Sequence, residues 1–210
     1  MYHVPLERLP VSNIKVLFSA LILGVIFLGC AAMGVPATSD PDKKIGYAYM
    51  LFDRQQRPLP AERLIREAIE IYQEKNNDLG LAEAYRAYGF FFRSGALEKW
   101  HKHYESDGFM EEGATYANRH EKSIEYFEKS AAIFEKHHKN DALTNVHLNM
   151  GFTYEFANQP EKACDEYKKS LVSNQLHIKE NPGVTFTLPE GFSSYEAYVT
   201  PMMDRLKCVK

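Results

Sequence analysis

The chain repeats its own residue pattern along much of its length. Shifted by 62 positions, residues 61–93 fall on residues 123–155, and a further shift of 40 positions brings residues 123–130 onto residues 163–170. Self-similarity at such a period is typical of helical repeat arrays, in which each helix pair buries its apolar side against the next pair. The matched small and aromatic positions are Ala61, Ser123 and Ala163; Ile65, Phe127 and Tyr167; Ala68, Ser130 and Ser170; Gly89 and Gly151; Phe90 and Phe152.

The hydrophobic pattern between the loops is helical. Apolar residues recur at helical spacing, and nothing before residue 184 alternates as strand residues do. Long helices joined by short loops form antiparallel pairs, so we expect an all-α fold of about three helix pairs. The predicted helices cover residues 41–54, 61–75, 79–93, 119–136, 142–156 and 161–175.

The last residues do not continue the repeat. A turn at residues 181–183 precedes a short helix expected from Tyr195 to about Leu206. An array needs a terminal element over its last apolar face, so residues 176–210 are predicted to be a C-terminal capping segment.

The first 29 residues have the pattern of an export signal. Arg8 and Lys15 precede an uncharged apolar run that ends at Leu28, and Gly29 and Cys30 follow it. A basic start, an apolar centre of this length and a small residue at the end are the parts of a signal peptide.

Residues 27–30, with the sequence Phe-Leu-Gly-Cys, resemble the lipobox of bacterial lipoproteins, although Phe27 stands where that family usually has an aliphatic residue. The resemblance implies a lipoprotein signal peptide over residues 1–29, lipidation of Cys30 and a membrane tether over residues 30–40. It also implies a lipid-anchored protein of the bacterial envelope, and Ala31 after the cysteine favours the outer membrane, facing the periplasm.

Two other readings of this N-terminus stay open. The uncharged stretch continues to Val35, and about 20 apolar residues can span a bilayer, so an uncleaved membrane anchor is the first alternative. An ordinary cleaved signal peptide is the second.

Residues 149–154, followed by residues 160–163, Tyr167 and Ser170, resemble a tetratricopeptide repeat (TPR). The resemblance implies a TPR-like array of helical hairpins over residues 41–175, in which a small residue lets two helices approach and aromatic residues fill the space beside it. Gly151 and Ala163 would form such a contact. It also implies a protein that binds other proteins or peptides.

About 22 residues more than the repeat needs lie within the middle repeat, and this insertion covers roughly residues 94–118. It contains the only tryptophan, Trp100. Tryptophan and tyrosine dominate interface hot spots, so the insertion could present Trp100 to a partner. The alternative is a lid whose aromatic residues pack back onto the array.

The TPR resemblance places the binding surface on the first helix of each pair. The candidate partner-binding residues are Glu83, Arg86, Phe90, Arg93, Asn145, Leu148, Asn149, Phe152 and Glu155, together with Trp100 of the insertion. The alternative for Phe90 and Phe152 is that they pack on the next helix.

Composition narrows the function classes. The chain carries 25 Lys and Arg against 28 Asp and Glu, without a basic cluster, so no nucleic-acid partner is expected. No phosphate-binding loop or hydrolase motif occurs, and His101, His103 and His120 lack ligands at a recognised metal spacing. We therefore expect no enzyme, no metal and no cofactor.

Two cysteines remain after Cys30. Cys164 and Cys208 form an even pair, which would suit a disulfide in an oxidising compartment. Two free thiols are the alternative, since spacing alone does not show whether the residues come close enough.

Two functions fit this sequence. The first is an envelope scaffold or assembly factor that binds other proteins through its repeats. The second is an immunity protein that inhibits a toxin effector delivered to the periplasm, a role that would suit a small acidic chain with an aromatic insertion.

Overall fold

The structure is a computed structural model that describes residues 35–184 and 188–208. Every regular element in these ranges is a helix, which confirms the predicted all-α class. The chain divides into two compact units, Met1–Ala37 and Thr38–Lys210. The predicted signal peptide and Cys30 lie outside the described residues. None of the helices in the described ranges is both long and apolar enough to cross a bilayer.

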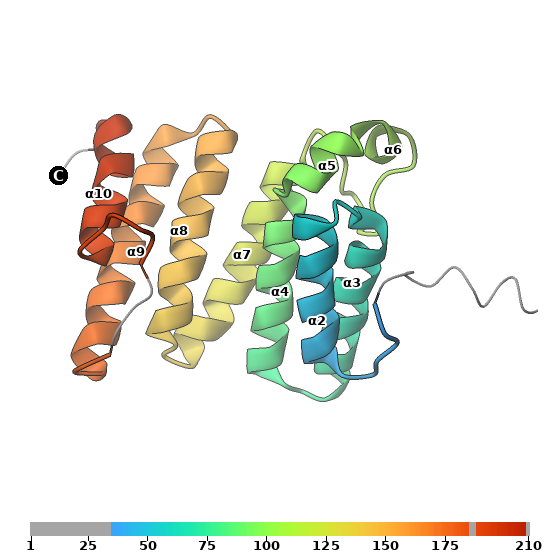
Figure 1. Cartoon of the computed structure of the whole chain (residues 1–210), viewed down its shortest axis with the longest axis horizontal. Coiled ribbons are helices and arrows are strands. Elements are labelled where there is room, and N and C mark those ends of the chain that lie inside the picture. Colours follow the sequence, from blue (N-terminus) through green and yellow to red (C-terminus); the bar gives the residue numbers. More distant parts are fainter. Residues whose placement is uncertain (1–34, 185–187, 209–210) are drawn as a thin grey trace, which may run out of the picture. The chain divides into compact units, whose positions relative to one another are not determined.

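The helices of the second unit stand side by side in a row that runs from α2 and α3 to α9 and α10, with the short α5 and α6 near one end of α3 (Figure 1). The elements are α2 (Pro41–Tyr49), which continues as the π-helical η1 (Met50–Arg54), α3 (Pro58–Glu74), α4 (Asp78–Phe92), α5 (Gly95–Lys99), α6 (His101–Ser106), α7 (Arg119–Lys136), α8 (Asn140–Phe156), α9 (Pro160–Glu180) and α10 (Tyr195–Arg205).

The same local device ends four of these helices. Asn76, His138, Asn158 and Lys207 follow α3, α7, α8 and α10 with φ angles of 50°, 53°, 55° and 57°. In each case the next residue's N–H donates to a carbonyl five residues back, as from Lys139 to Phe134 at 2.9 Å. Such left-handed caps satisfy carbonyl groups that the helix leaves free, so the chain can turn back sharply.

The start of α7 has no side-chain cap. Asn118 and Glu121 have the spacing that predicts a capping box there, but the Asn118 side chain makes no cap hydrogen bond. It accepts instead from the backbone N–H of Thr115 at 2.7 Å, within the insertion. The nearer turn at residues 115–118 therefore takes the side chain that would otherwise cap the helix.

Helices pack in three pairs, α2 with α3, α4 with α7 and α8 with α9, and contacts of α3 with α4 and of α7 with α8 join the pairs. Small residues allow the close approach. A Cβ atom added to Gly89 of α4 would lie 2.7 Å from the ring of Phe127 on α7, and one added to Gly151 of α8 would overlap the ring of Tyr167 on α9. A side chain at either glycine would therefore require the facing ring to move from its packed position.

Serines strengthen the same crossings. Ser123 and Ser130 of α7 donate hydrogen bonds to the carbonyl oxygens of Gly89 and Ala82 on α4, each at 2.8 Å. Ser170 of α9 donates in the same way to Thr144 on α8, also at 2.8 Å. All three serines are fully buried. Their hydroxyls bond to a facing helix, so each polar group is satisfied without water.

The C-terminal segment packs on the end of the row. Val199 of α10 is fully buried in the core, and α10 contacts α9. A disulfide joins Cys164 of α9 to Cys208, whose Cα atoms lie 5.5 Å apart. Of the two readings of this pair, the structure contains the bonded one, and the bond fastens the end of the chain to α9.

Candidate functional site

Arg86, Phe90 and Arg93 follow one side of α4 at helical spacing and are half-buried. Phe152 of α8 lies beside them. The Arg93 Cζ atom lies 5.0 Å from the ring centre of Phe90 and 5.9 Å from that of Phe152 on α8. Both rings also pack against the core. Arg93 thus bridges the two helices, and we call Arg86, Phe90, Arg93 and Phe152 the α4–α8 face.

The guanidinium of Arg93 has few hydrogen-bond partners. Its Nη2 atom donates to the Asn149 side chain, whereas its Nε atom is buried without a hydrogen-bond partner. Burial lowers the pKa of Arg93 to about 10, because a charged guanidinium is less stable away from water.

The Nε atom of Arg86 is likewise buried without a hydrogen-bond partner, but Arg86 has a carboxylate partner and Arg93 has none. Arg86 forms an ion pair with Glu83 at 2.5 Å and lies 5.9 Å from the ring centre of Phe134. Its charge also acts on Tyr49 of α2, whose pKa is raised because the phenol is buried, although Arg86 opposes this rise. Tyr49 lies edge-on to Phe90 at 5.9 Å. Tyr49 therefore extends this surface to α2, and the sequence did not single it out because its segment matches the repeat only weakly.

At the other end of this surface, Glu155 of α8 accepts hydrogen bonds from Arg205 of α10 at 2.7 and 2.9 Å and from the hydroxyl of Tyr167. Arg205 is a second residue that the sequence reasoning missed, because nothing local relates α10 to α8.

The predicted outward positions of α8 are only partly outward. Asn145, Phe152 and Glu155 are half-buried, but Leu148 and Asn149 are buried at 9% and 6% exposure. The prediction that these two side chains face a partner is wrong for Leu148, which belongs to the core. Asn149 contributes indirectly, by holding Arg93. The reason is that α8 lies between α7 and α9 and is buried on most sides.

The insertion packs against the helices as a lid would, and it also leaves Trp100 at its surface. Tyr104 is almost fully buried and stacks on Phe109 at 4.2 Å, and Phe109 lies 5.1 Å from Phe92 of α4. These aromatic side chains pack back onto the array. Trp100 remains 38% exposed, although its Nε1 atom donates to the carbonyl of Gln56 at 3.0 Å. The insertion is thus a packed cover with one large aromatic side chain at its surface.

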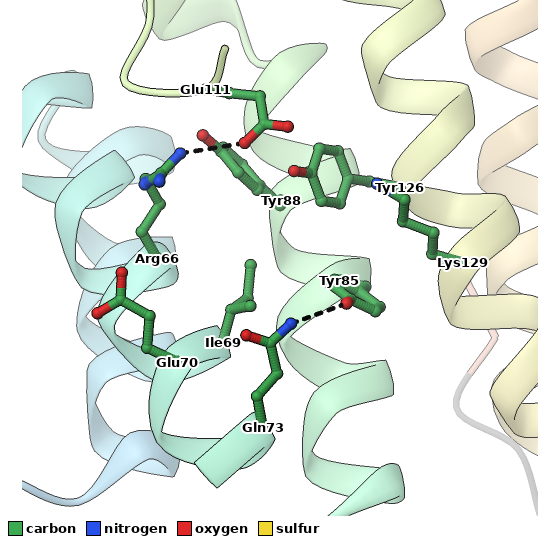
Figure 2. A pocket seen from close by; sticks show the side chains of 9 residues that line it. All are labelled: Arg66, Ile69, Glu70, Gln73, Tyr85, Tyr88, Glu111, Tyr126 and Lys129. Carbon is green, nitrogen blue, oxygen red and sulfur yellow. Dashed lines mark hydrogen bonds and ion pairs between the residues drawn. The ribbon is translucent and has the colours of Figure 1, made fainter.

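A pocket of about 300 Å³ lies where the insertion meets α3, α4 and α7. Figure 2 shows Arg66 of α3 reaching to Glu111 of the insertion, with the rings of Tyr88 and Tyr126 beside this pair. The Arg66–Glu111 ion pair measures 3.0 Å, and Arg66 also donates to the carbonyl of Met110 at 2.8 Å. The polar groups at the rim of the pocket, where the insertion meets α3, therefore bind one another.

Glu62 of α3 is a buried carboxyl group near this rim, with 1% of its surface exposed. It accepts hydrogen bonds from the Tyr88 hydroxyl at 3.0 Å and from the Met110 N–H at 2.8 Å. Burial raises the pKa of Glu62 to about 7, more than these hydrogen bonds lower it. Glu62 and Arg66 together hold the tip of the insertion against the array.

His101, His103 and His120, which a metal site would have to bring together, each contact a different residue. His103 pairs with Asp107 at 2.8 Å, and His120 stacks on Phe156 with ring centres 5.9 Å apart. His101 Nδ1 lies 3.0 Å from the carbonyl of Glu98. Within the described ranges, no three His, Cys, Asp or Glu side chains are grouped as a metal site would require.

No protein-family model, no curated protein and no solved structure matches the chain.

Proposed function

We propose that this chain is a lipid-anchored, TPR-like protein of the bacterial envelope that binds another protein through the α4–α8 face, as a scaffold or assembly factor. The helix pairs α2–α3, α4–α7 and α8–α9, with small residues at their crossings, support the TPR-like arrangement. The contact of α10 with α9 supports a capping role for the C-terminal segment.

One observation carries the proposed binding surface. Phe90 and Arg93 of α4 and Phe152 of α8 stay partly exposed, and the Arg93 guanidinium lies 5.0 and 5.9 Å from the two ring centres. Aromatic and arginine side chains dominate the energy of protein interfaces when a partner removes them from water. The proposed envelope location is supported by the Cys164–Cys208 disulfide, since such bonds persist mainly in oxidising compartments.

The proposal is tested by affinity capture of the full-length protein from detergent-solubilised envelopes, followed by titration of the captured partner. Phe152→Ala should weaken binding by about 2 kcal/mol or more while the helical content stays near wild type. Phe156→Ala is the matched control, because Phe156 lies on the same helix and is 62% exposed. Equal loss of binding in both variants would contradict the proposed face.

An immunity protein is the second candidate, and the exposed side chains of the insertion favour it. Trp100 and Met110 are 38% and 51% exposed on a packed segment, as expected of anchors that fill a pocket of an effector. In this case Trp100→Ala should abolish capture of a secreted toxin, whereas Phe152→Ala should leave that capture unchanged.

A further inference from the structure

Among the described residues, Arg93 is the cation of the α4–α8 region that lacks a carboxylate partner. Its contacts are the rings of Phe90 and Phe152 and the side-chain oxygen of Asn149. The two arginines nearby are paired, Arg86 with Glu83 at 2.5 Å and Arg205 with Glu155 at 2.7 Å. The carboxylates that could neutralise Arg93 are therefore engaged elsewhere.

This arrangement is unfavourable in the free protein. A guanidinium that loses water needs an anion or a full set of acceptors, and Arg93 has one side-chain acceptor and a buried Nε atom without any. The lowered pKa of Arg93 reflects the same deficit. Asn149 is held in turn by a hydrogen bond from its own Nδ2 atom to the carbonyl of Asn145 at 2.7 Å. The guanidinium is thus fixed in place with two aromatic rings and one amide oxygen beside its charge, and without a carboxylate partner.

We propose that Arg93 binds the side-chain carboxylate of an aspartate or glutamate in the partner protein. This inference rests on the proposed function and names the chemistry of the partner segment. A carboxylate pairs with a guanidinium through charge-assisted hydrogen bonds, which are stronger where water is excluded. The ring centres of Phe90 and Phe152 lie 5.0 and 5.9 Å from the charge. An acidic residue within a chain can place one apolar neighbour against each ring, whereas a terminal carboxylate has a neighbour on one side only.

The test selects binding segments with the full-length protein in detergent. A random library of twelve-residue segments is displayed on phage, with each segment fused to the coat protein at its C-terminal end, so only side chains can supply a carboxylate. Wild-type protein should enrich segments with Asp or Glu at one position next to apolar residues. Arg93→Gln should lose the acidic preference and keep the apolar one, because both rings remain. Arg63→Gln, which changes an arginine paired with Glu67 on α3, should select as wild type does.

A selected segment then measures how much its carboxylate contributes to binding. Replacing its acidic residue by the matching amide should weaken binding to wild type about 30-fold or more, and should change little for Arg93→Gln. Arg93→Lys should restore part of the difference, since it returns the charge without the planar fork. The melting temperature of free Arg93→Gln should not fall, because a charge without a carboxylate partner is removed.

The outcomes separate the two proposals. Enrichment of segments without an acidic position, or the same acidic preference in Arg93→Gln, overturns the carboxylate site and leaves the binding face intact. Binding of a segment only through a free C-terminal carboxylate, tested with synthetic peptides, also overturns it. A wild-type protein that enriches nothing contradicts the proposed function and this inference together.

Discussion

Glu62 is a carboxylic acid in a place where a charge is poorly solvated. Its raised pKa means that the folded protein binds this proton more tightly than the unfolded chain does. The stabilising contribution of that proton is fully present below pH 4.5, the usual pKa, and is lost as the pH rises through about 7. The stability of this protein should therefore decline over that interval.

We expect Glu62→Gln to flatten this decline. The glutamine oxygen can still accept from Tyr88 and Met110, and the amide resembles the protonated acid. Thermal melts from pH 4.5 to pH 8 should show a variant close to wild type at the acidic end and more stable at the basic end. Glu74→Gln, at an exposed position at the end of the same helix, is the control. Parallel profiles for wild type and Glu62→Gln would show that Glu62 does not titrate in this range.

At the scale of elements, the spacing between helices depends on where a side chain is missing. Gly151 faces the Tyr167 ring, whereas a Cβ atom added to Gly46 of α2 would meet no atom within 4 Å. Alanine favours a helix over glycine by about 1 kcal/mol. Gly46→Ala should therefore raise the free energy of unfolding by about 0.5–1 kcal/mol, and Gly151→Ala should lower it by about 1–3 kcal/mol.

Urea denaturation of the two variants measures both changes. The substitution is the same in each case, so the difference in sign isolates the contact with Tyr167. A stabilised Gly151→Ala variant would mean that α8 and α9 do not approach as closely as described.

Much of this element-level structure could be predicted from the sequence. The ends of α4 and α7 lie within one residue of the predicted ranges, because periodicity, small residues and turn residues are local signals. α9 continues to Glu180 beyond the predicted Gln175. What could not be predicted depends on distant neighbours. Ser130 looks like any small helix residue until Ala82 of α4 lies opposite its hydroxyl.

The candidate site was predicted less completely, for a related reason. A helical repeat identifies the side of α4 that carries Arg86, Phe90 and Arg93, and these residues do share one surface. It does not tell how deeply α8 is enclosed, so Leu148 was misplaced. The missing counter-ion of Arg93 is a property of all nearby acids together, and no sequence motif records it.

For the molecule as a whole, the disulfide closes a long loop. Cys164 and Cys208 are 44 positions apart, and the bond holds α10 on α9. Cross-links of this kind stabilise by about 2–4 kcal/mol, chiefly by restricting the unfolded chain. Cys208→Ser should therefore lower the melting temperature, and reduction of wild type should lower it by a similar amount. A double variant that also carries Cys164→Ser should melt as the single one does.

Hydrogen exchange shows which helices lose stability when the disulfide is removed. Faster exchange confined to α10 and the end of α9 is the expected pattern, because α10 packs mainly on α9 and helices far from the lost bond keep their contacts. Uniformly faster exchange over α2 and α3 as well would mean that the array opens as one unit.

The proposed anchor is tested by Cys30→Ser, which removes the sulfur atom that is proposed to carry the lipid. The variant should accumulate as an unprocessed precursor and should incorporate no labelled fatty acid in a bacterial host. The matched control is Cys208→Ser, which should be processed and labelled normally. Labelled Cys30→Ser protein would contradict the lipoprotein assignment.

The place of the insertion also has a consequence for how the chain finds its fold. α8 and α9 are joined by three residues, 157–159, whereas residues 93–118 separate α4 from α7. The entropy lost on closing a loop grows with its length, and pairs that are near in sequence form early. The loop between η1 and α3 is equally short, residues 55–57. We therefore expect the pairs α2–α3 and α8–α9 to associate first, and α8 to serve as a template for α7. The pair α4–α7 forms last, after Met110 at the tip of the insertion has bound Glu62 and Arg66.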